Sequence, residues 1–135
     1  MDADAIVAAM RSPKGASAAL LRAARTGRVV LLASVPLGIE YESVCSRPEH
    51  VAAAGFRPLD VTIFLDALVR LTEPVDTWFL WRPQLRDPGD ELVLEAAVNG
   101  HANAIVTFNR RDFKGGVNRF GIDILLPADA LRRIT

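Results

Sequence analysis

The sequence predicts an α/β fold with a mainly parallel sheet flanked by helices. Helical and strand-like hydrophobic periods alternate along the 135 residues, without a linker, a repeat or a low-complexity segment between them. The strand-like runs are short and continuously apolar, as is typical of strands buried on both faces of a parallel sheet. Half of the residues are hydrophobic, which is enough for a substantial core. We therefore expect a single domain over residues 1–135.

Local signals mark the ends of most predicted elements. Gly27 ends the predicted helix 12–27. Ser34 precedes the predicted helix 36–46, and Pro48 follows its end. Asp87 and Pro88 fit the N-cap and first position of a later helix. In chain order we predict helix 12–27, strand 28–34, helices 36–46, 47–55 and 58–74, strand 75–81, helix 87–101, strands 103–108 and 122–126, and helix 127–134.

Composition narrows the function classes. Lys plus Arg and Asp plus Glu balance at 16 each, so any polyanion would have to bind locally rather than to a global basic field. Cys45 is the single cysteine, which excludes an internal disulfide and a cysteine-rich metal site. No apolar run approaches the length that a membrane span requires. Without a leader-like N-terminus, the expected location is the cytoplasm.

Three acidic residues gather at the start of the predicted helix 87–101. Asp87, Asp90 and Glu91 lie within five residues of one another. Asp87 and Asp90 have the spacing of an N-cap and its third helical position, and acidic side chains favour the positive end of a helix dipole. In parallel α/β folds, however, ligands bind where strand ends and helix N-termini meet. Capping and ligand binding therefore both remain open for this cluster.

Glu40 favours a functional site. It lies on the helical stripe of Leu37, Tyr41 and Val44, so its carboxylate should face the core side of that helix. Burying an unpartnered carboxylate costs on the order of several kcal/mol, so we expect it to be neutral, paired with a cation or bound to a metal. Asp90 repeats the pattern on the later helix.

Glu40 and Asp90 could converge on one hard cation together with Asp2 and Asp4 near the N-terminus. Mg²⁺ and Mn²⁺ prefer oxygen ligands, and one or two carboxylates with waters suffice to hold Mg²⁺ beside a phosphate. The chemistry that such a site favours is phosphodiester hydrolysis.

Four stretches carry a family resemblance. In order along the chain, "DADAIVAAMRSPKGASAALLRAA", "LGIEYESV", "RDPGDELVLEAA" and "AIVTFNRRDF" resemble the motifs of PIN-domain proteins, in particular the branch related to the VapC toxins. The resemblance covers nearly the whole chain. It implies a three-layer sandwich in which helices flank a parallel sheet, and a ribonuclease whose acidic cluster binds Mg²⁺ or Mn²⁺ at the strand ends.

The resemblance also implies roles by position. Asp2 corresponds to the Asp that closes the family's first strand, Glu40 to the helix-borne Glu, and Asp90 to the principal Asp of the third motif. Asn109 takes the fourth position, where it would orient a ligand or water. The implied catalytic set is Asp2, Glu40, Asp90 and Asn109, and the implied metal ligands are Asp2, Glu40, Asp87, Asp90 and Glu91.

The sequence departs from the family pattern at its start. Asp4 stands where the family usually has Asn, and an extra carboxylate there adds repulsion or reaches a metal. The apolar residues that form the family's first, central strand are missing before Asp2. We expect either a natural start upstream of Met1, which is the reading we favour, or a sheet with a central gap that borrows a strand or shifts its pairing.

Several other residues have two readings each. Arg110, Arg111 and Lys14 follow proposed site motifs and would bind phosphates of a substrate, or they belong to solvated charged loops. Trp78 and Trp81 would stack a nucleobase, or pack in the core or at a dimer interface.

The resemblance implies the toxin half of a toxin–antitoxin pair, with an RNA substrate, an antitoxin protein as inhibitor and a homodimer. A catalytically inactive PIN-like module that binds RNA or protein is the first alternative. A receiver-like phosphoacceptor domain is the second, for which only Lys14 and Lys114 could supply the required lysine.

Overall fold

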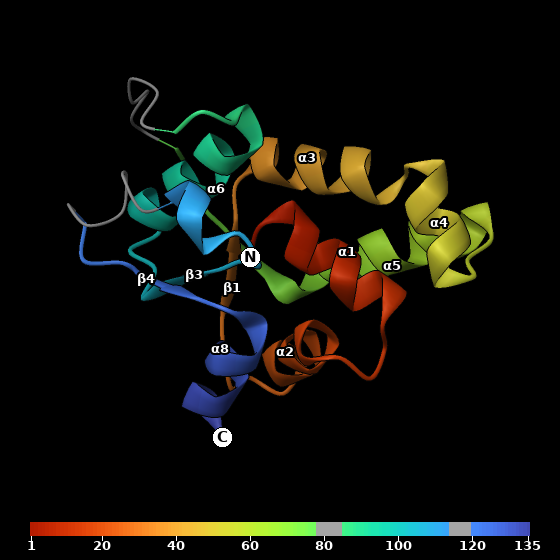
Figure 1. Cartoon of the computed structure of the whole chain (residues 1–135), viewed down its shortest axis with the longest axis horizontal. Helices are drawn as coiled ribbons and strands as arrows, with labels where there is room; N and C mark the ends of the chain where they lie inside the picture. The colour runs from red at the N-terminus through yellow and green to blue at the C-terminus, as the bar shows by residue number, and fades with distance from the viewer. Residues whose placement is uncertain (78–84, 114–119) are drawn as a thin grey trace.

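The computed structural model shows a helix-rich α/β protein with short parallel strands, which confirms the predicted fold class (Figure 1). It describes residues 1–77, 85–113 and 120–135. Within these ranges the elements are α1 (Ala3–Arg11), α2 (Ala16–Arg25), β1 (Leu31–Ala33), α3 (Val35–Cys45), α4 (Pro48–Ala54), α5 (Pro58–Leu71), β2 (Thr72–Pro74), α6 (Pro88–Asn99), β3 (Ala104–Val106), the 3-10 helix η1 (Arg110–Phe113), β4 (Asp123–Leu125) and α8 (Pro127–Ile134).

The described strands form two parallel pairs. β1 pairs with β2, with Leu31 opposite Thr72, and β3 pairs with β4, with Ala104 opposite Asp123. We expected one mainly parallel sheet. The parallel direction is confirmed, but β1 and β3 are not hydrogen-bonded to each other among the described residues. The three-layer arrangement therefore stays a prediction.

Two elements differ from the predicted order. β2 lies at Thr72–Pro74, within the range predicted as helix 58–74. Of the predicted strand 75–81, residues 75–77 are not strand and 78–81 lie outside the described residues. Pro74 explains the earlier end of α5, because proline lacks an N–H and disfavours helical geometry at Glu73. α1 has no predicted counterpart. Five of its nine residues are buried, and its two charged residues, Asp4 and Arg11, lie near its two ends, so its polar side is narrow.

α1 lies at the centre of the helical part of the molecule. It packs against α2, α3 and α4, while α3 also packs against α6, and α2 against α8 (Figure 1). Ile6 and Met10 of α1 join Leu37 of α3, Ile105 of β3 and Phe113 of η1 in one buried cluster. This core fixes α1, α3 and α6 relative to one another.

Side-chain caps at three helix starts lie close to the strand ends. Asp2 caps α1, Ser34 caps α3 directly after β1, and Asp87 caps α6. Each cap accepts hydrogen bonds from backbone N–H groups that have no partner within the helix. No helix in the three described ranges combines the length and the apolar character that crossing a bilayer demands.

Candidate active site

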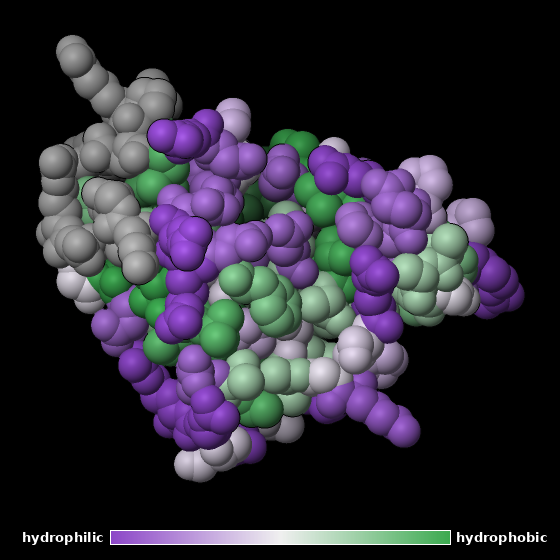
Figure 2. Space-filling model, in the orientation of Figure 1, coloured by the Kyte–Doolittle hydropathy of each residue, from purple (hydrophilic) through white to green (hydrophobic). Residues whose placement is uncertain are grey.

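Acidic residues from three helices line one pocket. Its volume is about 150 Å³, and it lies between the start of α1, the middle of α3 and the start of α6. Hydrophilic residues gather over the face of the molecule on which α3 and the start of α6 lie (Figure 2). The charged residues that line the pocket are Asp2, Asp4, Glu40, Asp87, Asp90 and Arg47.

Asp2 is held by hydrogen bonds on both of its carboxylate oxygens. Oδ1 accepts from the backbone N–H of Ala5 at 2.9 Å, and Oδ2 accepts from the Thr107 hydroxyl. The backbone N–H of Asp2 donates to the carbonyl of Val106 at 3.0 Å. Asp2 is only 4 % exposed, and burial raises the pKa of its carboxyl although both hydrogen bonds oppose the shift. Its orientation is therefore fixed before any ligand binds.

Glu40 lies against the start of α6. Its Oε1 is 3.0 Å from the point that a Cβ at Gly89 would occupy, and Asp87 Oδ1 is at the same distance from that point. Gly89 leaves room for both carboxylates, since a side chain there would displace one of them. Glu40 is half-buried, as its position on the inward stripe of α3 predicts.

Asp87 and Asp90 have different roles in the local structure. Asp87 Oδ1 accepts from the N–H groups of Gly89 at 2.7 Å and Asp90 at 3.2 Å, so Asp87 is the N-cap of α6. The reciprocal bond from Asp90, which a capping box would need, is absent from the described residues. Capping therefore accounts for Asp87 and leaves the carboxylate of Asp90 available to the pocket.

Asp90 has an unusual acidity. Burial, followed by the charges of Asp87, Asp112, Asp2 and Asp4, raises the pKa of its carboxyl to about 6. A carboxyl group with this pKa gains and loses its proton near neutrality. Like charges that crowd a carboxylate in this way favour either a proton or a cation in the same space.

Asn109 is positioned next to the pocket through Asp4. Its Nδ2 donates to Asp4 Oδ2 at 3.0 Å, and its backbone N–H donates to the Thr107 hydroxyl at 2.9 Å. The Thr107 hydroxyl in turn donates to Asp2. The residues after β3 therefore orient Asp2, the cap of α1, and Asp4 in its first turn. Asn109 does not line the pocket but contacts Asp4, which does.

The other predicted site residues lie outside the pocket lining. Glu91 turns away, because its Oε1 accepts from the backbone N–H of Leu85. Lys14 follows the far end of α1, about 13 Å along a nine-residue helix from the pocket. Arg110 and Arg111 are exposed on η1, which packs against α6 beside the pocket. Lys114, Trp78 and Trp81 lie outside the described residues.

Sequence reasoning missed two charged residues near the pocket. Arg47 lines it as the N-cap residue of α4, after the end of α3, so the helical period of α3 does not reach it. Asp112 lies three residues after Asn109, inside the fourth motif, and acts on Asp90 through its charge.

The donor atoms of the pocket suit a hard divalent cation, whereas their positions do not converge on a single ion. The donors are carboxylate oxygens, as Mg²⁺ and Mn²⁺ prefer. No three His, Cys, Asp or Glu side chains among the residues that the structure describes converge closely enough to hold one ion. Mg²⁺ usually keeps several waters and needs only one or two carboxylates, so the arrangement fits an ion held largely through water.

The comparison with known families identifies the chain. A family described as "PIN domain" matches residues 1–111, which is more than half of the chain. No curated protein and no solved structure matches this chain. The matched range includes α1, the acidic pocket and the strand end at Asn109. The chain therefore belongs to the PIN-domain family.

Proposed function

We propose that the chain is a divalent-metal-dependent ribonuclease that hydrolyses RNA phosphodiester bonds at the acidic pocket. PIN domains are generally nucleases, which supports the reaction class. The observation that carries the proposal is the pocket itself, which gathers carboxylates from three helices, and in which burial, followed by the charges of Asp87, Asp112, Asp2 and Asp4, raises the pKa of Asp90 to about 6. A divalent cation would relieve this repulsion, because its charge offsets that of the carboxylates.

Glu40 and Asp90 are the residues that would hold Mg²⁺ or Mn²⁺, with Asp2 and Asp87 beside them. When bound, the ion would supply positive charge that polarises water and the phosphate oxygens. Glu91 is left out of the set, because its carboxylate already accepts the N–H of Leu85.

The remaining residues would position the substrate and the carboxylates. Thr107 and the N–H of Ala5 hold Asp2, and Asn109 holds Asp4. Arg47 brings a guanidinium to an otherwise acidic lining, where it would bind phosphate oxygens. Arg110 and Arg111 on η1 would contact the RNA backbone further from the reacting phosphate.

The four motifs that resemble the VapC branch support a narrower proposal. The protein would be the toxin of a toxin–antitoxin pair in the cytoplasm, inhibited by an antitoxin protein and assembled as a homodimer. These features rest on the resemblance, whereas the nuclease proposal also rests on the pocket.

Cleavage of single-stranded RNA tests the proposal. We expect cleavage with Mn²⁺, loss of cleavage with EDTA, and loss in Glu40→Gln, which keeps the shape of the side chain and removes its charge. Glu42→Gln is the matched control, because Glu42 is exposed on the same helix and lies outside the acidic pocket. Equal cleavage by Glu40→Gln and Glu42→Gln would contradict the proposed site.

One observation favours a second candidate, a catalytically inactive module that binds RNA or protein. The described acidic side chains do not converge in threes on one ion position. RNA binding without Mn²⁺-dependent cleavage, in a folded protein, would favour this candidate over the nuclease.

A further inference from the structure

Phe108 is an exposed aromatic residue just after the carboxyl end of β3. Its exposed fraction is 50 %, and it is the one aromatic residue among the large hydrophobic residues that are exposed in the described ranges. The other described phenylalanines are buried in the core, as Phe113 is, or pack against it, as Phe64 does. Single exposed apolar residues are common on protein surfaces, so exposure alone assigns no role to Phe108. Its surroundings have to supply one.

Both sequence neighbours of Phe108 hold carboxylates of the acidic pocket. The Thr107 hydroxyl donates to Asp2, and Asn109 Nδ2 donates to Asp4 Oδ2 at 3.0 Å. Asp2 and Asp4 both line the pocket. Because consecutive Cα atoms are only about 3.8 Å apart, Phe108 is attached to the backbone at the rim of the pocket and not on a remote surface.

Hydrogen bonds fix the backbone on both sides of Phe108. The N–H of Thr107 donates to the carbonyl of Leu125 at 2.9 Å, and the N–H of Asn109 donates to the Thr107 hydroxyl at 2.9 Å. The N–H of Asp112 donates to the carbonyl of Asn109 at 3.0 Å. A side chain on a backbone that is already ordered can bind a ligand with a small further loss of conformational entropy.

Exposed cations follow the aromatic side chain. Arg110 and Arg111 lie on η1, which packs against α6 beside the pocket (Figure 1). Proteins bind single-stranded nucleic acids by stacking bases on aromatic side chains while cationic side chains hold the backbone phosphates. The four residues from Phe108 to Arg111 offer both kinds of group at the rim of the pocket.

We propose that Phe108 is a stacking platform for one unpaired nucleobase of the RNA, beside the phosphate that the acidic pocket receives. This inference rests on the proposed function and narrows its substrate to RNA with an unpaired base next to the cleaved bond. A base inside a duplex has neighbours on both faces, whereas the bases of loops and single strands can be splayed out and stacked on a side chain.

The platform would select an unpaired base rather than a particular sequence. Every nucleobase has a flat π face, so stacking tolerates all four bases. Modest preferences would follow stacking strength, which favours the larger purine rings. Phe108 would therefore act as a residue that determines substrate structure, while the carboxylates of the pocket carry out the reaction.

RNA binding without cleavage tests the platform. Binding of a short fluorescein-labelled single-stranded RNA is measured by fluorescence anisotropy in EDTA, so that metal-dependent hydrolysis does not interfere. Phe108→Ala should weaken binding about tenfold, and Phe108→Trp should bind at least as tightly as the parent. Phe108→Leu should resemble Phe108→Ala, because leucine keeps an apolar contact without an aromatic face. Ile63→Ala on α5 is the matched control, since Ile63 is 57 % exposed and lies outside the acidic pocket.

Two further measurements separate stacking from a structural effect. The melting temperature of Phe108→Ala should stay within about 2 °C of the parent, because a half-exposed side chain contributes little to stability. An abasic nucleotide at one position of the RNA should weaken binding to the parent about tenfold. The same nucleotide should have little further effect on Phe108→Ala, because the ring and the base form a single interaction.

Equal RNA affinity of the parent and Phe108→Ala would overturn the proposal, as would absence of RNA binding by the parent. A Phe108→Leu protein that binds like the parent would also overturn it and would assign Phe108 to a general apolar contact, such as one with a protein segment. Abasic losses of equal size in the parent and in Phe108→Ala would do the same. Stacking without any Mn²⁺-dependent cleavage would uphold the platform and count only against the proposed nuclease.

Discussion

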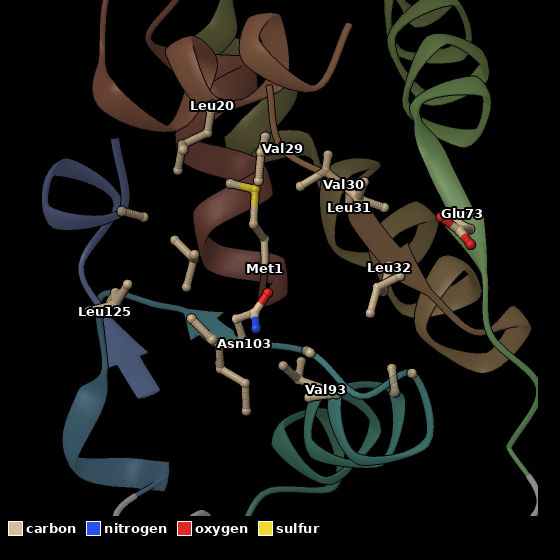
Figure 3. A pocket seen from close by; sticks show the side chains of 18 of the residues that line it. Met1, Leu20, Val29, Val30, Leu31, Leu32, Glu73, Val93, Asn103 and Leu125 are labelled. Atoms are coloured by element: carbon tan, nitrogen blue, oxygen red, sulfur yellow. The ribbon is translucent and has the colours of Figure 1, made fainter. Parts of the chain in front are cut away.

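The acidic pocket and an apolar cavity of about 420 Å³ between β1 and β3, here called the apolar slot (Figure 3), meet at Met1 and Asp2 but differ in chemistry. The pocket is lined by five carboxylates and one guanidinium, so its unmet need is positive charge. The slot is lined largely by aliphatic side chains, among them residues of β1 and β3. The volume of a cavity therefore does not indicate where catalysis takes place, because the larger cavity lacks the cluster of carboxylates that the smaller one has.

Thr107 and Tyr41 connect the two regions. Thr107 donates to Asp2 in the pocket, and Tyr41 donates to Met1 at the end of the slot. These two hydrogen bonds reach the regions only at Asp2 and Met1. A substitution in one region that moves neither residue should therefore leave the structure of the other region unchanged. The following predictions use this separation.

The largest expected effect is on catalysis at the pocket. Asp90→Asn should lower RNA cleavage with Mn²⁺ by about a hundredfold or more, on the order of 3 kcal/mol in the barrier, while the protein stays folded. Asp66→Asn on α5, an exposed position outside this pocket, is the control. If Asp90→Asn cleaves at nearly the parental rate, the catalytic role proposed for Asp90 is wrong.

A smaller effect is expected from the packing beside the slot. In Gly100→Ala, the new Cβ would lie 2.7 Å from Leu32 Cδ1 and 2.9 Å from the carbonyl of Ala96. We expect a loss of about 1–3 kcal/mol in the free energy of unfolding, measured in urea, because the backbone of α6 cannot move aside freely. Gly38→Ala is the matched control, since nothing lies within 4 Å of its Cβ position in α3. A neutral Gly100→Ala would mean that this contact is loose.

The pH dependence of stability should distinguish the pocket from the slot. The raised pKa of Asp90, about 6, means that the folded state binds its proton more tightly than the unfolded chain does. The resulting stabilisation is present at low pH and is lost as pH rises through about 6. Asp90→Asn should therefore stabilise the protein more at pH 7 than at pH 4, by about 1 kcal/mol after solvent screening.

Urea unfolding of both proteins at the two pH values measures this difference. Gly38→Ala again provides a control, because it changes no charge. An Asp90→Asn protein with the same stability difference from the parent at pH 4 and pH 7 would contradict the crowding of carboxylates around this residue.

Local sequence signals predicted much of the fold. The helix predicted at 127–134 is α8 as observed, and Asp87 with Pro88 marks the start of α6. The predicted helix 58–74 extended over the residues of β2, although Pro74 disfavours a helix there. α1 was missed because it is buried on most sides. The α1 error occurs where burial against other helices hides the sequence period, whereas the β2 error concerns a local signal at Pro74.

Some of the site residues could likewise be predicted from the helical period, and others could not. The helical stripe of α3 placed Glu40 on the inward side, and the structure brings it together with Asp2, Asp87 and Asp90. Glu91 lies only one residue beyond Asp90, but its helical direction takes it to Leu85. A gap at the centre of the sheet was one of two expectations from the sequence, but the residues that line the slot come from segments far apart in the chain and were not predicted. The roles in catalysis and metal binding stay predictions.

The central claim is that the carboxylates of the acidic pocket bind a divalent cation. Calorimetric titration with Mn²⁺ measures this directly on the folded protein, and Glu40→Gln and Glu42→Gln supply the test and its control. The account predicts one binding event in the parent and in Glu42→Gln, weakened at least tenfold in Glu40→Gln, about 1.4 kcal/mol. Binding should also raise the melting temperature of the parent, since the ion favours the folded state. Absence of binding at millimolar Mn²⁺, or equal binding by both variants, would contradict the account.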